Sequence, residues 1–458
     1  MLKHPRRLVL ELLCRCEQGE HCNVVLAAAL RETMLAPRER KFVSALFYGT
    51  LRWQPRIDFE LQEVLNKRLQ SFHPEVRNLL RLGLYQIDYA YSVPPEVAVA
   101  TTVSLAEEVG QQQAKSMINA VLRKLSKVRK RLLTKQESLK YGLSTELFGL
   151  FKQAYGIETA RRIAEVFLNE RQELSLRPNL LHPKYNQLPE ILQAEGIELK
   201  TGTYLEDSLS IITGGRDLAS LASFQEGLWS VQDEAAQLVS RIADLSPGTR
   251  VLDACAAPGG KTADLFARNG GDLFILAAEL KAERFKSLED IFNRLNYPKA
   301  SELTANRGIY PQLRDASQAL ADAEIKAFDA VLLDVPCTAS GLIGKQADLR
   351  SKLSYEKFQS LLPIQAKILN CQAEAVKNSG VLIYSTCSIL PAENSEQIAK
   401  FLQSPLGREF ERVEIEHLIP EKLRQCAIQP ALGELLLRPD LSPEIDGFFI
   451  AKLRRKDG

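Results

Sequence analysis

The fold of this chain is decided by Arg250-Val251-Leu252-Asp253-Ala254-Cys255-Ala256-Ala257-Pro258-Gly259-Gly260-Lys261-Thr262. The stretch has the pattern of a short β-strand, a turn of small residues and the start of a helix. Glycines let such a turn approach a ligand closely, and the first N–H groups of the helix attract a carboxylate or phosphate. It therefore predicts the first strand-turn-helix unit of a ligand-binding α/β domain.

The same alternation of strand and helix continues through the second half of the chain. Further short apolar runs lie at residues 273–278, 330–333 and 381–384, with helical stretches between them. Strands that alternate with helices in this way form a doubly wound, mostly parallel sheet, whose ligands lie past the carboxyl ends of the strands. We therefore expect an α/β domain over residues 231–458.

An acidic residue ends the second strand. Glu279 follows Asp253 by 26 residues, and a carboxylate there can accept hydrogen bonds from both ribose hydroxyls of an adenosine cofactor. An ordinary tight turn followed by a surface glutamate has the same spacing. The spacing alone therefore leaves both interpretations open.

A phosphate-binding loop is an alternative interpretation of the first turn. Gly260-Lys261-Thr262 resembles the end of a P-loop, and the run 331–334 resembles its magnesium-binding strand. A P-loop needs a further glycine five positions before Gly260, where this chain has Cys255. This alternative predicts magnesium-dependent ATP binding at Lys261.

Two cysteines lie just past two of the predicted strands. Cys337 follows the run 332–336, and Cys387 follows the strand at 381–384. Because parallel strands end at one edge of their sheet, both thiols are expected in one cleft. A thiolate can attack a substrate covalently, but the sequence does not assign separate roles to the two cysteines. Cys371 and Cys426 lie in apolar surroundings and are interpreted as core residues.

Composition excludes several classes of protein. The chain has 458 residues, of which 45% are hydrophobic, enough for two to four folded domains. It has no uninterrupted apolar stretch of the length of a signal peptide or membrane span, so we expect a cytosolic protein without a membrane partner. Its eight cysteines do not form a disulfide framework in a chain this long. No metal is expected, because Cys14, Cys16 and Cys22 have no second ligand pair at metal spacing.

The first third of the chain is predicted to be helical. Apolar residues recur at helical spacing in four stretches, around residues 8–16, 42–46, 76–84 and 103–109. Gly49, Gly83 and Pro94-Pro95 are interpreted as breaks between helices, and a basic run at 124–131 closes this part. From 136 to about 230, helical segments alternate with short extended candidates near 174–176 and 211–213, which predicts a small α+β module.

This helical part is also basic. Residues 1–135 carry 22 Lys/Arg against 13 Asp/Glu, a balance of +9, so the rest of the chain (37 against 44) is at −7. Binding of Lys and Arg to phosphates releases condensed counterions, which favours a nucleic-acid surface. A solvated helical surface has a similar composition, so charge alone does not decide between them.

Several motifs together resemble one known family. They occupy residues 224–235, 253–262, 334–337, 385–388, 391–395 and 446–452. In this combination the chain resembles the Sun/Fmu-type RNA cytosine-5 methyltransferases. The segments at 48–52, 80–86 and 119–123 are similar to the NusB-like RNA-binding domain that bacterial members carry before the methyltransferase domain.

The resemblance implies a multidomain protein of three parts. These are an all-α NusB-like RNA-binding domain over residues 1–135, a small α+β connecting module over 136–230, and a Rossmann-like methyltransferase domain over 231–458. The implied activity is transfer of a methyl group from S-adenosylmethionine to carbon 5 of a cytosine in 16S ribosomal RNA. The protein is expected to act as a monomer on unassembled or unwound RNA, because a stacked base cannot present its carbon 6.

By the same resemblance, Cys387 would attack the base, Cys337 would assist its release, and Asp334 would hold it. The residues implied for cofactor binding are Cys255, Ala256, Ala257, Pro258, Gly259, Gly260, Lys261, Glu279, Asn306 and Asp334. For Cys255, simple packing is the preferred interpretation, because a backbone contact there needs no thiol. A non-catalytic RNA-binding factor that uses only the NusB-like part is the other alternative.

The chain also departs from the family pattern. Asn306 is interpreted as replacing an aspartate that relatives carry after the third strand, near the adenine. Glu279 replaces a commoner aspartate. After Cys337, the usual basic pair and His-Pro-Asp are replaced by the segment 340–348. The two cysteines and Asp334 are intact.

Overall fold

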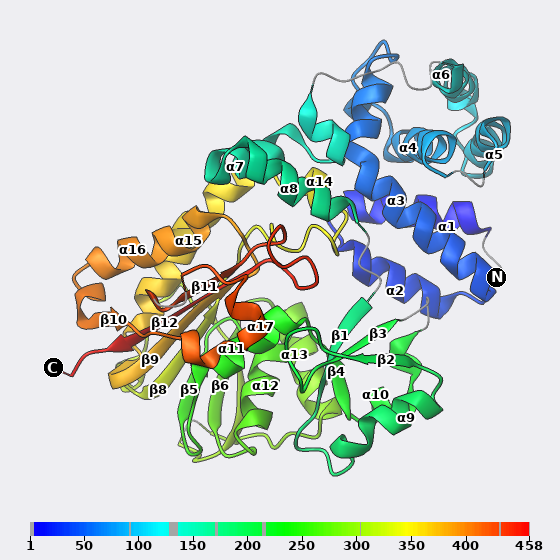
Figure 1. Cartoon of the computed structure of the whole chain (residues 1–458). Helices are drawn as coiled ribbons and strands as arrows, with labels where there is room; N and C mark the ends of the chain where they lie inside the picture. The colour runs from blue at the N-terminus through cyan, green and yellow to red at the C-terminus, as the bar shows by residue number, and fades with distance from the viewer. Residues whose placement is uncertain are drawn as a thin grey trace. The chain divides into compact units, whose positions relative to one another are not determined.

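The computed structural model describes residues 4–90, 93–127, 136–169, 173–212, 217–302, 304–429 and 432–457. They form two compact units: Met1–Glu170 with Ile343–Tyr355, and Arg171–Leu342 with Glu356–Gly458 (Figure 1). The predicted boundaries near residues 135 and 230 stay predictions, and the basic run beyond Lys127 lies outside the described residues. Among the described helices, none is long and apolar enough to cross a membrane.

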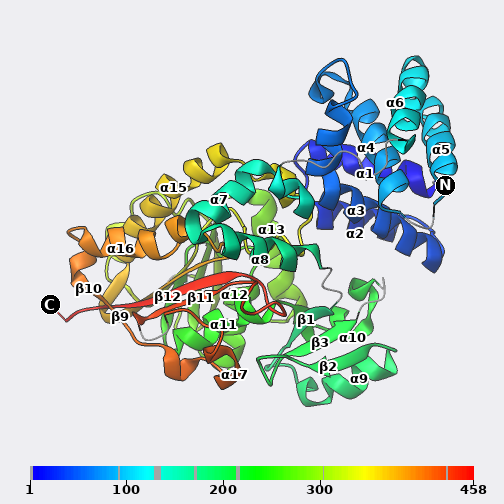
Figure 2. The ribbon, with the colours of Figure 1, turned by 45° about the horizontal axis from the view of Figure 1, so that its top comes forward.

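The first unit is built from helices, as Figure 2 shows from a second direction. They are α1 (Pro5–Glu17), α2 (Cys22–Glu32), α3 (Pro37–Gln62), α4 (Pro74–Asp88), α5 (Pro95–Glu108), α6 (Lys115–Lys127), α7 (Thr145–Tyr155), α8 (Ile157–Leu168) and the later α14 (Leu349–Lys352). Four of them begin at proline, which lacks the N–H that the first turn of a helix leaves unpaired. Their apolar faces share one core that includes Leu12, Phe47 and Leu80. The predicted all-helical start is confirmed.

Two glycines interpreted as helix breaks lie inside helices instead. At Gly49 in α3, an added Cβ atom would lie 1.9 Å from the Tyr85 hydroxyl oxygen. At Gly83 in α4, it would lie 2.5 Å from the Leu122 side chain. Both glycines therefore make room for a neighbouring side chain, and this outweighs the low helix propensity of glycine. The prediction of breaks at these two positions was wrong, whereas Pro94-Pro95 does begin a helix.

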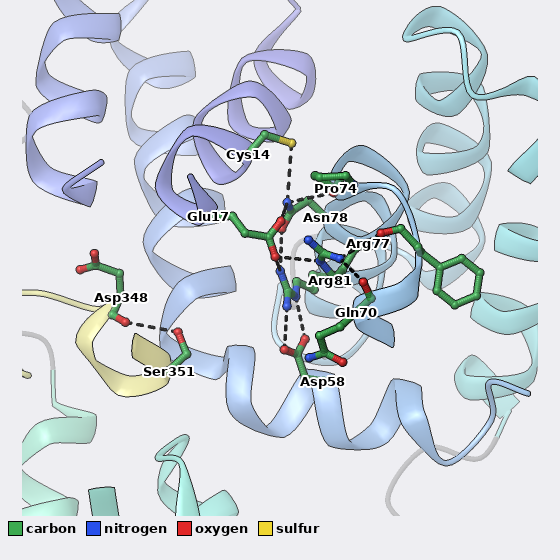
Figure 3. Close-up of polar contacts among 11 residues, drawn as sticks. Cys14, Glu17, Asp58, Gln70, Pro74, Arg77, Asn78, Arg81, Asp348 and Ser351 are labelled. Carbon is green, nitrogen blue, oxygen red and sulfur yellow. Dashed lines mark hydrogen bonds and ion pairs between the residues drawn. The ribbon is translucent and has the colours of Figure 1, made fainter. Parts of the chain in front are cut away.

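A buried arginine links three helices of the first unit (Figure 3). Arg81 in α4 is 4% exposed and donates to both carboxylate oxygens of Asp58 in α3, at 2.7 and 2.8 Å. It also donates to Glu17 in α1, at 2.9 Å. Glu17 accepts a second hydrogen bond from Arg77, at 2.7 Å. These charges are paired in a fork geometry that a lysine could not reproduce.

Loss of this arginine should destabilise the first unit. Arg81→Met is expected to lower the free energy of unfolding by about 2–4 kcal/mol, because Asp58 and Glu17 would lose a buried partner. Arg15→Met is the matched control, since Arg15 pairs with Glu20 where both side chains are more than 40% exposed, and it should have little effect. Chemical denaturation followed by circular dichroism measures both variants. Equal losses in both would contradict the expectation.

Residues 343–355 also belong to the first unit. Asp348 is buried there and accepts hydrogen bonds from the Cys22 thiol, at 3.0 Å, and from Lys352, at 2.8 Å. Arg350 is fully buried and donates to the backbone carbonyls of Tyr141, at 2.9 Å, and Phe167. Part of the segment that departs from the family pattern is therefore a structural element of the helical unit. Figure 3 shows Asp348 beside Ser351.

The second unit begins with a small antiparallel sheet. Its elements are β1 (Glu173–Pro178), α9 (Leu188–Ala194), β2 (Glu198–Thr201), β3 (Leu209–Ile212), α10 (Ala222–Gln225) and β4 (Trp229–Val231), with strand order β2-β3-β1-β4. One face packs on α9 and α10 through Leu176, Ile211 and Trp229. The other face contacts the larger sheet's helices, for example through the ion pair of Arg177 with Asp264, at 3.0 Å.

The larger sheet follows in the same unit. Its elements are α11 (Glu234–Ala243), β5 (Arg250–Asp253), α12 (Gly260–Arg268), β6 (Phe274–Glu279), α13 (Ala282–Arg294), β7 (Gly308–Leu313), β8 (Phe328–Asp334), α15 (Tyr355–Ala373), β9 (Val376–Thr386), α16 (Ser395–Gln403), β10 (Phe410–Arg412), α17 (Glu421–Arg424), β11 (Glu434–Leu437) and β12 (Phe448–Arg455). The order is β10-β12-β9-β8-β5-β6-β7, and β11 pairs with β12. Strands β5 to β9 pair in parallel and β10 to β12 antiparallel. The predicted α/β class is confirmed.

Candidate active site

Parallel strands of the larger sheet end at one edge, and predicted site residues gather there. The last residues of β5, β6, β8 and β9 are Asp253, Glu279, Asp334 and Thr386. Cys337 lies in the turn after β8, and Cys387 follows β9 directly. The edge thus combines acidic groups, two thiols and a loop of small residues.

The two thiols are in contact. The Sγ atoms of Cys337 and Cys387 lie 3.3 Å apart, although 50 residues separate them in the chain. The hydrogen bond with Cys387, burial, and the charges of Cys387 and Glu393 all raise the pKa of Cys337 well above its ordinary value. The predicted common location of the two cysteines is therefore present in the structure.

An ion pair lies beside the thiols. Lys261, in the first turn of α12, donates to Asp334 at 2.7 Å, and its ammonium group lies 5.3 Å from the centre of the Phe448 ring. Burial opposes the positive charge, but Asp334 and the Cys387 thiol hold the pKa of Lys261 above its ordinary value. The other oxygen of Asp334 accepts a hydrogen bond from Ser385, at 3.0 Å. Lys261 therefore neutralises Asp334, the carboxylate that would be the magnesium ligand in the P-loop alternative.

The loop between β5 and α12 has the features of a ligand cradle. Gly259 caps α12 with φ of +107°, a conformation that strongly favours glycine. Asp253 is buried, and burial raises its pKa to about 7. One of its oxygens accepts from Thr262, at 2.6 Å, while the other has no hydrogen-bond partner of ordinary geometry in the described part of the chain. Such an orphaned oxygen fits a site that completes its hydrogen bonds with a polar ligand.

The remaining loop residues contribute backbone and packing. Ala256 donates its N–H to the carbonyl of Ala278, at 2.8 Å, which ties the loop to β6. Cys255 is partly buried against the core, and burial raises its pKa well above its ordinary value. These observations agree with the packing interpretation of Cys255. Ala257 and Pro258 continue the loop, and the carbonyl of Ala257 accepts a hydrogen bond from Arg284.

The end of β6 provides an acid and apolar surface. Glu279 is 4% exposed, and one of its oxygens accepts the N–H of Lys281, at 2.9 Å. The other lies 3.7 Å from a guanidinium nitrogen of Arg284. Two large apolar side chains at the same edge, Leu280 and Leu313, are more than half exposed. Exposed leucines beside a buried acid fit an adenosine, whose base is apolar on its faces and whose ribose carries two hydroxyls.

One predicted cofactor residue lies elsewhere. Asn306 is exposed and precedes β7, and Gly308 at the start of β7 pairs with Phe274 at the start of β6. Asn306 therefore lies at the edge opposite the other predicted site residues, and the prediction that it follows the third strand was wrong. The third strand ends at Leu313, so the loop after it contains Asp315. The inferred replacement of an aspartate by Asn306 is corrected accordingly.

Asp315 was missed by the sequence reasoning. Its carboxylate accepts the N–H of Ser317, at 2.8 Å, and the side-chain amide of Gln318, at 3.1 Å. These hydrogen bonds lower its pKa, so the group is ionised at neutral pH. It was missed because the strand before it, β7, was not predicted. This strand contains Pro311 and polar residues that hide its apolar pattern.

This correction can be tested by cofactor binding. Asp315→Ala should weaken S-adenosylmethionine binding by about 5- to 20-fold, as expected for one hydrogen bond to a charged acceptor. Asn306→Ala is the matched control and should leave the dissociation constant unchanged. Isothermal titration calorimetry with the full chain measures both. A loss at Asn306 with none at Asp315 would restore the original assignment.

Two glycines hold the cysteine loop against the carboxyl end of the chain. The N–H of Gly341 donates to the Cys387 carbonyl at 2.9 Å, and the N–H of Gly447 donates to the Gly341 carbonyl at 3.1 Å. A Cβ atom on Gly341 would lie 2.0 Å from the carbonyl oxygen of Gly447. The motif at 446–452 is therefore in direct contact with the loop that follows Cys337.

The doubly wound sheet, the loop after β5 and the acids at the ends of β5 and β6 define an S-adenosylmethionine-dependent methyltransferase. A family described as 16S rRNA methyltransferase RsmB/F matches residues 241–454, and the NusB family matches residues 3–127. The chain belongs to the RsmB/F family of 16S rRNA methyltransferases, in the form that carries a NusB domain.

Individual relatives agree over most of the chain. It is 32% identical over 460 residues to the probable ribosomal RNA small subunit methyltransferase B of Bacillus subtilis, covering 98% of each protein. It is also 32% identical over 419 residues to ribosomal RNA small subunit methyltransferase B of Pseudomonas putida, covering 91% of this chain and 90% of that protein. The crystal structure of PH0851 has the same fold, with a TM-score of 0.85 at 24% identity over 99% of this chain and all of that one.

A second solved structure shares the fold of part of the chain. NSun6 from Pyrococcus horikoshii, determined with SFG, has a TM-score of 0.58 at 18% identity, covering 68% of this chain and 98% of that chain. Membership of a methyltransferase family replaces the P-loop interpretation of residues 260–262. It also assigns the methyltransferase activity to the second unit, and not to the helical part alone.

Proposed function

We propose that the protein methylates carbon 5 of a cytosine in 16S ribosomal RNA through a covalent bond between Cys387 and carbon 6 of the base. The observation that carries this proposal is the contact of two thiols, 3.3 Å apart, at the edge that holds the Lys261–Asp334 ion pair. Methylation of an amine or a hydroxyl group needs no thiol, whereas carbon 5 of cytosine needs one to become nucleophilic.

The residues can be assigned to successive steps. The Cys387 thiolate would add to carbon 6, which makes carbon 5 an enamine-like nucleophile. Asp334 would hold the ring nitrogen and the exocyclic amine, where charge changes during addition, and Lys261 would hold Asp334 in position. When bound, S-adenosylmethionine would supply an electrophilic methyl group to carbon 5 and leave as S-adenosylhomocysteine. The proton on carbon 5 is then removed, and the carbon–sulfur bond breaks to restore the ring and the Cys387 thiolate.

The charges around the thiols support this division of roles. Lys261 is positive and interacts electrostatically with Cys387. Glu393 is one of the groups that raise the pKa of Cys337, so this thiol stays protonated while Cys387 attacks. Cys337 would act after methyl transfer, in the removal of the carbon 5 proton.

The cofactor residues follow from the same edge. The loop 254–261 would hold the methionine part, Glu279 the ribose hydroxyls and Asp315 the adenine amine. The RNA would be bound by a single copy of the chain, with the target cytosine unstacked, because carbon 6 is covered in a helix. Unassembled or unwound 16S ribosomal RNA meets this condition.

Release of tritium tests the position of methylation. A 16S transcript labelled with tritium at carbon 5 of cytosine should lose one tritium to water for each methyl group that it gains. The release should require S-adenosylmethionine. Methyl transfer without tritium release would place the methyl group on nitrogen or ribose, and the proposal would fail.

A further inference from the structure

A fully buried glutamate lies behind the two cysteine turns. Glu393 ends the short 3₁₀ turn Pro391–Glu393, and none of its surface is exposed. Its backbone carbonyl accepts the Tyr384 hydroxyl, at 2.7 Å, so the turn is fixed to β9. Its side chain is oriented away from solvent and is not placed to exchange a proton with water. Its surroundings therefore favour a role in positioning neighbouring residues over a role in proton transfer.

The carboxylate of Glu393 binds the residue that follows each cysteine. Thr338, after Cys337, donates its N–H at 2.9 Å and its hydroxyl at 2.5 Å. Ser388, after Cys387, donates its hydroxyl to the same carboxylate. One side chain thus connects two turns that lie 50 residues apart in the sequence. The sulfur atoms of the two cysteines in these turns lie 3.3 Å apart.

Gln365 of α15 completes the arrangement. It is fully buried and donates from its side-chain amide to Glu393, at 2.9 Å, and to the carbonyl of Pro336, at 3.0 Å. The residues on both sides of Cys337 are therefore held by hydrogen bonds, one directly by Gln365 and one through Glu393. All four groups that donate to the carboxylate are neutral. Burial of a carboxyl group with no cationic partner among these donors costs free energy, so a function beyond packing accounts for its presence here.

We propose that Glu393 is a positioning residue that holds the turns at Cys337 and Cys387 against each other, so that both thiols reach one base. The proposal rests on the proposed function, because it concerns the two-cysteine reaction. Hydrogen bonds to two independent turns set the separation of the thiols more tightly than either turn would alone. A misplacement of about 1 Å in such a pair can cost on the order of 100-fold in rate.

The first variant to test is Glu393→Gln, which keeps the shape but replaces one acceptor oxygen by a donor. The expected result is a fall in kcat of about 100-fold, with the KM for S-adenosylmethionine and the affinity for RNA unchanged. Glu434→Gln is the matched control, because Glu434 is also buried but pairs with Arg412, on β10. The control should keep kcat within about twofold of the wild type.

A thiol-bridging reagent measures the geometry without reference to activity. Dibromobimane becomes fluorescent when it links two neighbouring thiols, and it should link Cys337 to Cys387 in the wild type, as mapped by peptide mass spectrometry. The link should form much more slowly in Glu393→Gln. If that variant does not fold, Thr338→Val removes one hydrogen bond to Glu393 and should show the same change to a smaller degree.

The outcomes separate the two proposals. An unchanged rate of bridging and an unchanged kcat in folded Glu393→Gln would overturn the positioning role. A loss of kcat equal to that of Glu434→Gln would also overturn it, because the effect would be general destabilisation. Slower bridging in Glu393→Gln, together with no 5-methylcytidine from the wild type, would support the positioning role and reject the proposed function.

Discussion

A Cys337→Ala variant is expected to remain covalently attached to its RNA. Cys387 is intact in this variant, so it still adds to carbon 6 and methyl transfer still proceeds. The proton on carbon 5 is then removed too slowly for the carbon–sulfur bond to break. With labelled 16S transcript and S-adenosylmethionine, a denaturing gel should show a slowly migrating protein–RNA band, and turnover should fall to a single event per enzyme.

The double variant Cys337→Ala with Cys387→Ala is the control for this band. It should show no adduct, because the attacking thiol is absent. An adduct that survives in the double variant would come from another cysteine. An adduct that forms in Cys387→Ala but not in Cys337→Ala would reverse the roles of the two thiols.

The second large effect is expected for Cys387→Ala. Without the attacking thiol, carbon 5 never becomes nucleophilic, so kcat should fall by on the order of 10⁴-fold or more, as in other enzymes that lose their covalent nucleophile. Binding of RNA should persist, because it depends on many phosphate contacts and not on this thiol. Filter binding and methyl incorporation measure the two properties on one preparation.

Cys14→Ala is a suitable control for Cys387→Ala. Cys14 is a partly buried thiol of the first unit, where it accepts a hydrogen bond from Asn78. Its removal should leave methylation near the wild-type rate. Residual methylation of more than a few per cent in Cys387→Ala would mean that the thiol is not the nucleophile.

Much of the fold could be predicted from the sequence because its signals are local. The strands β5, β6, β8 and β9 are short apolar runs followed by turns, and the helices of the first unit show a 3.6-residue period. The strand β7 lacks such a signal, since Pro311 and Gln312 lie in its middle. This strand was therefore not predicted, and Asn306 was taken in place of Asp315 as the residue that follows it.

The candidate site was predictable only in part. The common location of Cys337 and Cys387 followed from parallel strands that end at one edge. The ion pair of Lys261 with Asp334 and the contacts of Glu393 could not be predicted, because both join segments far apart in sequence through side-chain geometry. Gly49 and Gly83 illustrate the same limit. Glycine occurs both where two helices approach closely and where a helix breaks, so the sequence does not distinguish the two cases.

The most direct test of the account is a methylation assay with nucleoside analysis. Purified protein is incubated with S-adenosylmethionine, labelled in its methyl group, and protein-free 16S ribosomal RNA, and the RNA is digested to nucleosides. The account predicts that the label appears as 5-methylcytidine. Label in any other nucleoside would contradict methylation at carbon 5, and absence of label despite intact cofactor binding would contradict protein-free 16S RNA as the substrate.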